Sequence, residues 1–177
     1  MALSGSWDLS FDTSLGGPAR VRFDTLTDWR QNADAGIRYY SGIAKYIKHF
    51  DLSVSQNKDS RIWLDLGKVN IMASVKLNGQ PLGVVWTDPW RVDITSAVKA
   101  KDNFLEIEVA NLWINRMIGD DALPDDGITN GKWPSWLEQG QPRPSSRISF
   151  ITNPVYHSKD TLMPSGLLGP VTIQRER

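Results

Sequence analysis

Glycine and proline interrupt this sequence so often that few of the segments between them are long enough for a helix. The chain holds 14 glycines and 10 prolines among its 177 residues. Several of the short segments alternate apolar and polar residues, which is the period of a half-buried β-strand. In Asn103–Ala110 (NFLEIEVA), the aliphatic residues predict an inward face and the two glutamates an outward face. The sequence therefore predicts an all-β fold.

The strongest turn signal is Asn78–Gly79, which lies between the apolar segments Met72–Leu77 and Pro81–Trp86. Both turn residues tolerate the positive φ of a type I′ turn, so we expect a β-hairpin. Many short strands with turns between them predict an antiparallel β-sandwich, and the pattern leaves the jelly-roll and immunoglobulin topologies as alternatives. The other expected strands are Ser6–Phe11, Arg20–Phe23, Ser41–Leu52, Arg61–Leu66, Arg91–Ile94, Ile148–Thr152 and Val171–Gln174, and helical turns are expected near Asp28, at Thr95–Lys101 and at Leu112–Gly119.

The expected strand Ser41–Leu52 is apolar on both of its faces. Ile43 and Ile47 fall on one face, and further apolar residues fall on the other. A strand of this kind is buried on both faces, or it packs one face on a neighbouring module.

Charge and cysteine content exclude several classes of protein. The 20 basic and 20 acidic residues give a formal net charge of zero without a basic run, so we expect neither nucleic acid nor a membrane as a partner. The absence of cysteine excludes a disulfide framework. The opening MALSGSWDLS lacks the pattern of a signal peptide. The length suits one domain over residues 1–177, which fits either a natural start at Met1 or a module cut from a longer chain.

The segment Trp86–Arg91 combines two indoles with an acid and a guanidinium group. A sugar ring packs its C–H bonds on an aromatic face, while its hydroxyls bond to carboxylates and guanidinium groups. Such a site requires both indoles to be exposed on the same side. The alternative is that they close one end of the sandwich. The candidates for carbohydrate binding here are Trp86, Asp88, Trp90 and Arg91.

The segment after Asn103–Ala110 is the second candidate. It would pack on another domain, belong to the internal structure, or place a polar side chain near a substrate. The candidates for an interface are Asn111, Trp113, Arg116 and Asp120.

Residues Asp120–Arg147 form a long proline-rich loop. A loop longer than about 12–15 residues in a compact domain is usually functional or rests on a partner. Trp133 and Trp136 are the indoles expected to be exposed, either lining a substrate cleft or pressing on a neighbouring domain.

The acidic residues of this loop suggest a glycosidase pair or a calcium site. An irregular loop is a poor scaffold for two rigidly placed carboxyl groups. The stretch DDALPDDG also lacks the EF-hand spacing, and two histidines are too few for a metal triad. We therefore expect no catalytic residue, no metal site and no cofactor, with a structural calcium ion as the alternative. The acidic residues concerned are Asp120, Asp121, Asp125, Asp126 and Glu138.

Several longer phrases resemble the sugar-binding-domain-like β-sandwich of large glycoside hydrolases, the galactose-binding-like jelly roll, and are similar to the family 2 sugar-binding domain. The opening SWDLSFD, together with NLWINRMIGD and PSGLLGPV, looks more like the C-terminal module of family 106 α-L-rhamnosidases. The phrases are GIRYYSGIAKYIKHF (Gly36–Phe50), RIWLDLGKV (Arg61–Val69), ASVKLNGQPLGVVWTDPWRVDIT (Ala73–Thr95), NFLEIEVANLWINRMIGD (Asn103–Asp120) and LMPSGLLGPVTI (Leu162–Ile173).

This resemblance implies a non-catalytic accessory module of a carbohydrate-active enzyme. In such enzymes the acid and base lie in a separate domain, so the expected partner is the catalytic domain of the same or parent polypeptide, with plant or bacterial polysaccharide as a further ligand. A periplasmic or extracellular location is also implied. The alternatives are an autonomous carbohydrate-binding module and a small free-standing glycosidase that uses the loop carboxylates.

Overall fold

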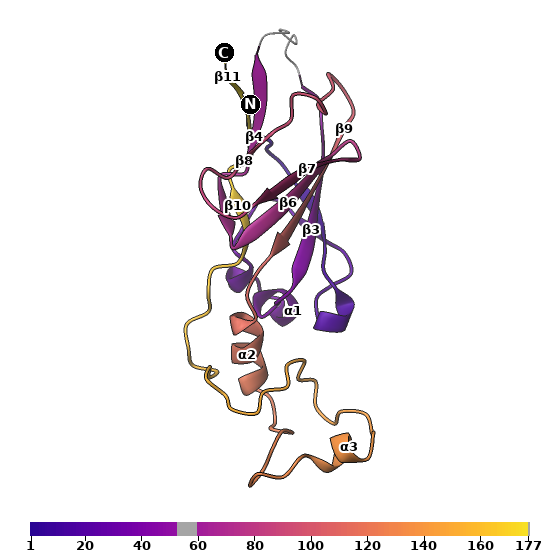
Figure 1. The fold of residues 1–177 in the computed structure, drawn as a ribbon, viewed down its shortest axis with the longest axis vertical. Coiled ribbons are helices and arrows are strands. Elements are labelled where there is room, and N and C mark those ends of the chain that lie inside the picture. The colour runs from indigo at the N-terminus through magenta and orange to yellow at the C-terminus, as the bar shows by residue number, and fades with distance from the viewer. Residues whose placement is uncertain (53–59, 177) are drawn as a thin grey trace.

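The computed structural model describes residues 1–52 and 60–176. Within these ranges the chain is built mainly from short strands joined by turns (Figure 1). The strands are β1 (Trp7–Ser10), β2 (Val21–Phe23), β3 (Ile43–Phe50), β4 (Arg61–Asp65), β5 (Lys68–Asn70), β6 (Met72–Leu77), β7 (Gln80–Val85), β8 (Arg91–Asp93), β9 (Asn103–Ala110), β10 (Gly166–Gly169) and β11 (Thr172–Glu176). The helices are η1 (Thr13–Leu15), η2 (Trp29–Gln31), α1 (Ala35–Arg38), α2 (Ile114–Asp121) and α3 (Ser135–Glu138).

The strands form the two layers of a β-sandwich. One layer is a six-stranded antiparallel sheet in the order β2-β1-β3-β9-β6-β7. The other consists of the sheets β11-β4-β8 and β10-β5. Alternate residues of both layers are buried between them, as two-layer packing of half-buried strands requires. The predicted all-β sandwich is therefore confirmed, and the buried inner positions include Ala44, Tyr46, Leu105, Ile107 and Val109 in the larger sheet and Leu64, Val69 and Leu167 in the smaller ones.

The predicted hairpin is also confirmed. β6 and β7 are joined by Asn78 and Gly79, whose φ angles are 52° and 85°. These are the left-handed values that a type I′ turn needs. The outer face of the larger sheet is polar in the middle, where Lys45 and Lys76 form ion pairs with glutamates of β9.

One end of that outer face is apolar. Ile43 of β3 and Met72 of β6 both lie opposite Ala110 of β9. Ile43 is 57% exposed, and Met72 is also exposed. The strand Ser41–Leu52 was expected either to be buried on both faces or to pack one face on a neighbouring module. The exposure of Ile43 shows that the first alternative does not hold at this position.

One local expectation is wrong. Residues 148–152 form no strand, because the backbone N–H of Ile148 donates to the carboxylate of Asp120 instead of to a neighbouring strand. The helical turn expected at Thr95–Lys101 is present as a single turn, in which the backbone N–H of Val98 donates to the carbonyl of Ile94 at 2.9 Å. The amide of Asn103 holds the end of this turn by bonding to both backbone groups of Lys99. The short strands β5 and β10 were not expected, because each is too short to show an alternating pattern.

Between α2 and β10 the chain leaves the sandwich. Residues 122–164, called the arm below, extend from the end of the molecule opposite to the two chain ends (Figure 1). The arm contains the short helix α3 and no strand among its described residues. No helix within the described part of the chain is long and apolar enough to cross a bilayer.

The phenol of Tyr46 forms hydrogen bonds between the two layers of the sandwich. The hydroxyl of Tyr46 accepts from the indole N–H of Trp29 at 2.6 Å and from the backbone N–H of Leu167 at 3.1 Å. Tyr46 and Trp29 are fully buried, and the ring of Trp29 packs edge-on against Phe11 and Tyr40. The phenol therefore links the larger sheet to β10 of the second layer.

We expect the change Tyr46→Phe to lower the free energy of unfolding by about 2–4 kcal/mol, because it leaves two buried donors without an acceptor. Urea denaturation followed by circular dichroism measures this loss. Tyr39→Phe is the matched control: Tyr39 is half-buried, keeps its ring contact with Arg38, and should change stability by less than about 0.5 kcal/mol. Equal effects of the two changes would contradict the assignment.

Candidate functional site: the arm and its anchoring helix

Helix α2 holds the returning end of the arm through Asn115. The side-chain amide of this buried residue donates to the backbone carbonyl of Met163 at 2.8 Å and accepts from the backbone N–H of Met163 at 2.7 Å. The same amide donates to Ser165 at 3.0 Å. The amide of Asn115 thus bonds to both backbone groups of Met163, as a neighbouring strand does in a sheet. These bonds fix the end of the arm just before β10 begins.

Asp120, near the end of α2, holds the middle of the arm. Its Oδ2 accepts from the backbone N–H groups of Ile148 and Ser149, at 2.9 and 2.6 Å, and from the Ser149 hydroxyl at 2.8 Å. Its Oδ1 lies 3.5 Å from the guanidinium group of Arg116, one helical turn earlier. Asp120 is 1% exposed. A buried carboxylate needs such donors, and here they come from the arm.

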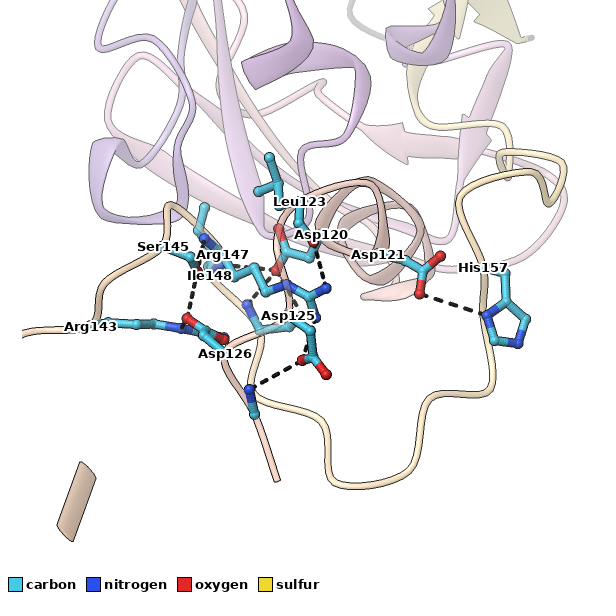
Figure 2. A network of polar contacts seen from close by, with 12 residues as sticks. Asp120, Asp121, Leu123, Asp125, Asp126, Arg143, Ser145, Arg147, Ile148 and His157 are labelled. Atoms are coloured by element: carbon cyan, nitrogen blue, oxygen red, sulfur yellow. Dashed lines mark hydrogen bonds and ion pairs between the residues drawn. The ribbon is translucent and has the colours of Figure 1, made fainter. Parts of the chain in front are cut away.

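Arg116 connects this anchor to the sandwich, because its guanidinium group donates to the backbone carbonyl of Leu15 at 3.3 Å. The next carboxylate of α2, Asp121, accepts from the backbone N–H of Ser158 at 2.7 Å, and this bond lowers the pKa of Asp121 below its ordinary value. His157 lies 3.6 Å from the same carboxylate. The arm is therefore attached to α2 at three places, through Asn115, Asp120 and Asp121. Figure 2 shows Asp120 beside Ile148 and Asp121 beside His157.

Asp126 and Arg143 brace the arm from inside. The guanidinium group donates twice to the carboxylate, at 2.7 and 2.8 Å, and the hydroxyl of Ser145 donates to the same carboxylate (Figure 2). These hydrogen bonds, chiefly those from Arg143, lower the pKa of Asp126 to about 2. A carboxyl group with this pKa is ionised at neutral pH and does not supply a proton as a general acid does. The result counts against Asp126 as the acid of the free-standing glycosidase alternative.

The arm also carries three aromatic side chains in contact. The rings of Trp133 and Phe150 stack with centroids 6.0 Å apart and an interplanar angle of 14°. Trp136 meets the ring of Phe150 edge-on at 6.1 Å, and its indole N–H donates to the backbone carbonyl of Asp126 at 2.8 Å. We call Trp133, Trp136 and Phe150 the aromatic shelf. Trp133 is 51% exposed, whereas Trp136 is half-buried beside Arg143.

The Trp86–Arg91 candidates do not form a shared aromatic surface. Trp86 is 71% exposed, but Trp90 is half-buried and packs against the apolar core. Asp88 is exposed, and the guanidinium group of Arg91 lies 4.5 Å from the centroid of the Trp63 ring. The condition that both indoles be exposed on the same side is not met.

The four interface candidates also differ in their exposure. Asn111 is half-buried and internal, because its amide accepts from the backbone N–H of Gly42 and donates to the carbonyl of Tyr40, both at 2.9 Å. Arg116 and Asp120 are buried and bond to groups of their own chain, as the alternative of internal structure expects. Of the four candidates, only Trp113 presents an exposed side chain, at 47%.

The loop acids do not gather as metal ligands. Within residues 1–52 and 60–176, no three acidic or histidine side chains are placed to hold a metal ion. Asp125 illustrates the reason, since it accepts from the backbone N–H of Gly127 and lies 3.7 Å from the guanidinium group of Arg147. The structure therefore adds no support to the calcium alternative.

Sequence reasoning missed the partners of these residues. The segment carries no periodic pattern that would pair these residues. The ring stacking of Phe150, the bonds of Arg143 to Asp126 and of Arg147 to Leu123, and the bond of Ser149 to Asp120 each join residues at least 14 positions apart. The one available signal is the excess of arginine and serine in residues 143–149 opposite the acids of residues 120–126.

The two-layer sandwich and its strand order define a galactose-binding-like domain. The chain belongs to the glycosyl hydrolase 2 galactose-binding domain-like family, whose family model matches residues 29–142. The expected fold and family are therefore confirmed.

Two larger proteins match nearly the whole chain. A protein of Formosa agariphila bearing the name "Putative beta-glucuronidase" is 43% identical, over 97% of this chain and 15% of its own length. The solved rhamnosidase from Novosphingobium sp. PP1Y has a TM-score of 0.83 and 35% identity, over 99% of this chain and 15% of that chain. The β-glucuronidase of Ruminococcus gnavus, with a TM-score of 0.52, 22% identity and 63% and 20% coverage of the two chains, shares the fold.

The chain thus spans about 15% of the length of the first two relatives. It is a galactose-binding-like domain that corresponds to a small part of larger glycoside hydrolases, in agreement with a non-catalytic accessory module.

The low pKa of Asp126 gives a test of the arm's internal brace. Because its pKa in the folded chain, about 2, is below the ordinary value of 3.8, the brace stabilises the arm at higher pH and is lost as the pH falls from about 4 to about 2. We expect ¹³C NMR titration of the Asp126 carboxyl carbon to show this pKa, and the Trp136 indole N–H signal to move with it.

Arg143→Gln should raise the pKa of Asp126 towards 3.8, since the guanidinium group is the main cause of its lowering. Lys132→Gln, which also removes one positive charge from the arm, is the control and should leave the pKa of Asp126 unchanged. A titration of Asp126 near 3.8 in the unaltered chain would show that the brace does not form.

Proposed function

We propose that this domain is an accessory module of a larger glycoside hydrolase, and that it docks on the catalytic domain of the same polypeptide through its arm. The observation that carries this proposal is the exposure of large apolar side chains on the arm. Trp133, Leu137, Phe150 and Val155 are all exposed, Val155 to 72%. Trp133 and Phe150 stack on each other, and an exposed apolar patch of this kind usually marks a contact surface.

The arm is also ordered before it meets a partner. Its bonds to Asn115, Asp120 and Asp121 fix its position relative to the sandwich, and the Asp126–Arg143 pair fixes its interior. A surface that is already ordered loses little conformational entropy on docking. This arrangement suits a permanent contact between domains of one chain.

The length comparison supports a partner within the same chain. The Formosa agariphila and Novosphingobium proteins are each more than six times longer than the segment that this chain matches, because that segment is 15% of their length. Their names are those of glycoside hydrolases. By analogy, the partner of this domain is a glycosidase catalytic domain.

A second candidate function is carbohydrate contact at the aromatic shelf. The exposed ring of Trp133 lies flat on Phe150, and aromatic faces of this kind accept the C–H face of a sugar. In a docked module the shelf would contribute to the edge of a substrate cleft. In an isolated module it would serve as a weak binding platform.

The docking proposal is tested by substitution within the complete glycoside hydrolase polypeptide that contains this domain. Trp133→Ser removes an exposed apolar side chain from the arm, and we expect faster backbone hydrogen exchange in residues 122–164 together with faster proteolytic cleavage of the arm. Trp86→Ser is the matched control, because it removes an equally large exposed indole from the sandwich rather than from the arm.

If the arm exchanges at the same rate in the complete polypeptide and in the isolated domain, docking through the arm is wrong. If Trp86→Ser loosens the contact and Trp133→Ser does not, the contact lies on the sandwich. The exposed end of the larger sheet, with Ile43 and Met72, is then the surface to examine.

A further inference from the structure

Asparagine followed by glycine occurs twice in this chain, as Asn78–Gly79 and as Asn130–Gly131. The two asparagines have φ angles of 52° and 54°, and the two glycines have φ angles of 85° and 72°. Both pairs therefore adopt the left-handed backbone of a type I′ turn. The two turns share their dipeptide and their backbone form, and they differ in what surrounds the asparagine side chain.

The side-chain amide of Asn78 is held by hydrogen bonds on both of its ends. Its NH₂ group donates to the backbone carbonyl of Ala97 at 2.8 Å and to the amide oxygen of Asn103 at 3.0 Å. Its oxygen accepts from the backbone N–H of Phe104 at 2.9 Å. These bonds tie the β6–β7 turn to β9 and to the segment before β9. The amide of Asn78 leaves its position only when all three bonds break.

The side-chain amide of Asn130 has no such partners. Asn130 is exposed, and its amide bonds to no group of residues 1–52 and 60–176. The turn lies on the arm and is closed by one isolated bridge, in which the backbone groups of Thr129 and Lys132 bond to each other at 3.2 and 3.1 Å. A Cβ atom added at Gly131 would meet no atom within 4 Å, so the space beside this glycine is open. An exposed turn with so few contacts opens locally at low cost.

An exposed asparagine amide reacts with the backbone nitrogen of the residue that follows it. This nitrogen loses its proton to a base in the solvent and attacks Cγ of the asparagine, which closes a five-membered succinimide ring. The C–N bond of the side-chain amide breaks, and its nitrogen takes up a proton from water and leaves as ammonia. Water then opens the ring at either carbonyl, giving aspartate or isoaspartate. Glycine favours the closure, because it has no Cβ atom and its backbone turns freely.

From these contacts we propose that Asn130 is a site of spontaneous deamidation, and that the tertiary structure protects Asn78 from the same reaction. Each turn has to open before its ring can close, so the rate follows the population of the opened form. Opening at Asn130 breaks the isolated bridge between Thr129 and Lys132. Opening at Asn78 breaks three side-chain hydrogen bonds and disturbs the pairing of β6 with β7.

The reaction changes the arm beside the aromatic shelf. It replaces a neutral amide by a carboxylate three residues before Trp133. The isoaspartate form also adds a methylene group to the main chain between Thr129 and Lys132, which alters the spacing that their bridge requires. The exposed surface of the arm thus gains a negative charge as the protein ages. This inference rests on the two turns and not on docking through the arm.

The test compares both asparagines in one sample. The chain is kept in mildly alkaline buffer and digested at successive times, and the aspartate and isoaspartate forms of the two peptides are separated by chromatography and identified by mass spectrometry. We expect conversion at Asn130 to be at least about tenfold faster than at Asn78, which corresponds to a barrier lower by about 1.4 kcal/mol. The rate at Asn130 should rise with pH, because the attacking nitrogen must first lose its proton.

Two controls separate the fold from the dipeptide. In guanidinium chloride the unfolded chain should convert at both asparagines at similar rates, because the protecting contacts of Asn78 are gone. Asn130→Gln keeps an amide at the turn but moves it one methylene too far for the five-membered ring. This variant should abolish conversion at its own position and leave the rate at Asn78 unchanged, with an unshifted Trp136 indole N–H signal showing that the arm is intact.

The proposal is overturned if Asn78 converts as fast as Asn130 in the folded chain. It is also overturned if Asn130 persists in the folded chain while the unfolded chain converts there, because the turn would then be protected. A tenfold difference that remains in guanidinium chloride would assign the selectivity to neighbouring sequence and not to the fold. The docking experiment with Trp133→Ser has no bearing on these outcomes, so the two proposals fail separately.

Discussion

The buried carboxylate of Asp120 joins the two parts of this molecule. The sandwich is held by apolar burial between two sheets, which the arm lacks. The arm instead takes its position from polar contacts with α2, of which the three hydrogen bonds to Asp120 are the most concentrated. Arg116 connects the same helix to the end of η1 at Leu15. A charge in a buried place is tolerated only with such partners, so the helix and the arm require each other.

This division of forces explains how the domain combines a stable body with an exposed surface. Many apolar residues of the sandwich are buried in its core, as Tyr46 and Leu105 are. Because the arm is organised by the Asp126–Arg143 pair and by α2, its larger apolar side chains need not be buried within it. Trp133 and Val155 remain exposed and available to a partner. Polar contacts within the arm thus leave its apolar side chains on the surface.

Strands of regular period were predictable, and irregular ones were not. β9 alternates over eight residues, so its faces follow from the sequence alone. β5 has three residues and β10 has four, so neither can carry a recognisable period. The apolar residues Ile148 and Ile151 suggest a strand, but Asp120 takes the backbone N–H of Ile148, and the segment lies outside the sandwich. Long-range hydrogen bonding overrides the local pattern there.

The sequence by itself determined the sandwich, its principal hairpin, the balanced charge, the family resemblance and the exposure of Trp133, because alternation, turn chemistry and composition are local properties. Only the tertiary structure decided which side chains meet. It separated Trp86 from Trp90, stacked Trp133 on Phe150, and placed Asp120 and Arg147 around one cavity. Such contacts join residues far apart in an aperiodic segment, and their energies depend on burial and distance, which a linear pattern does not encode.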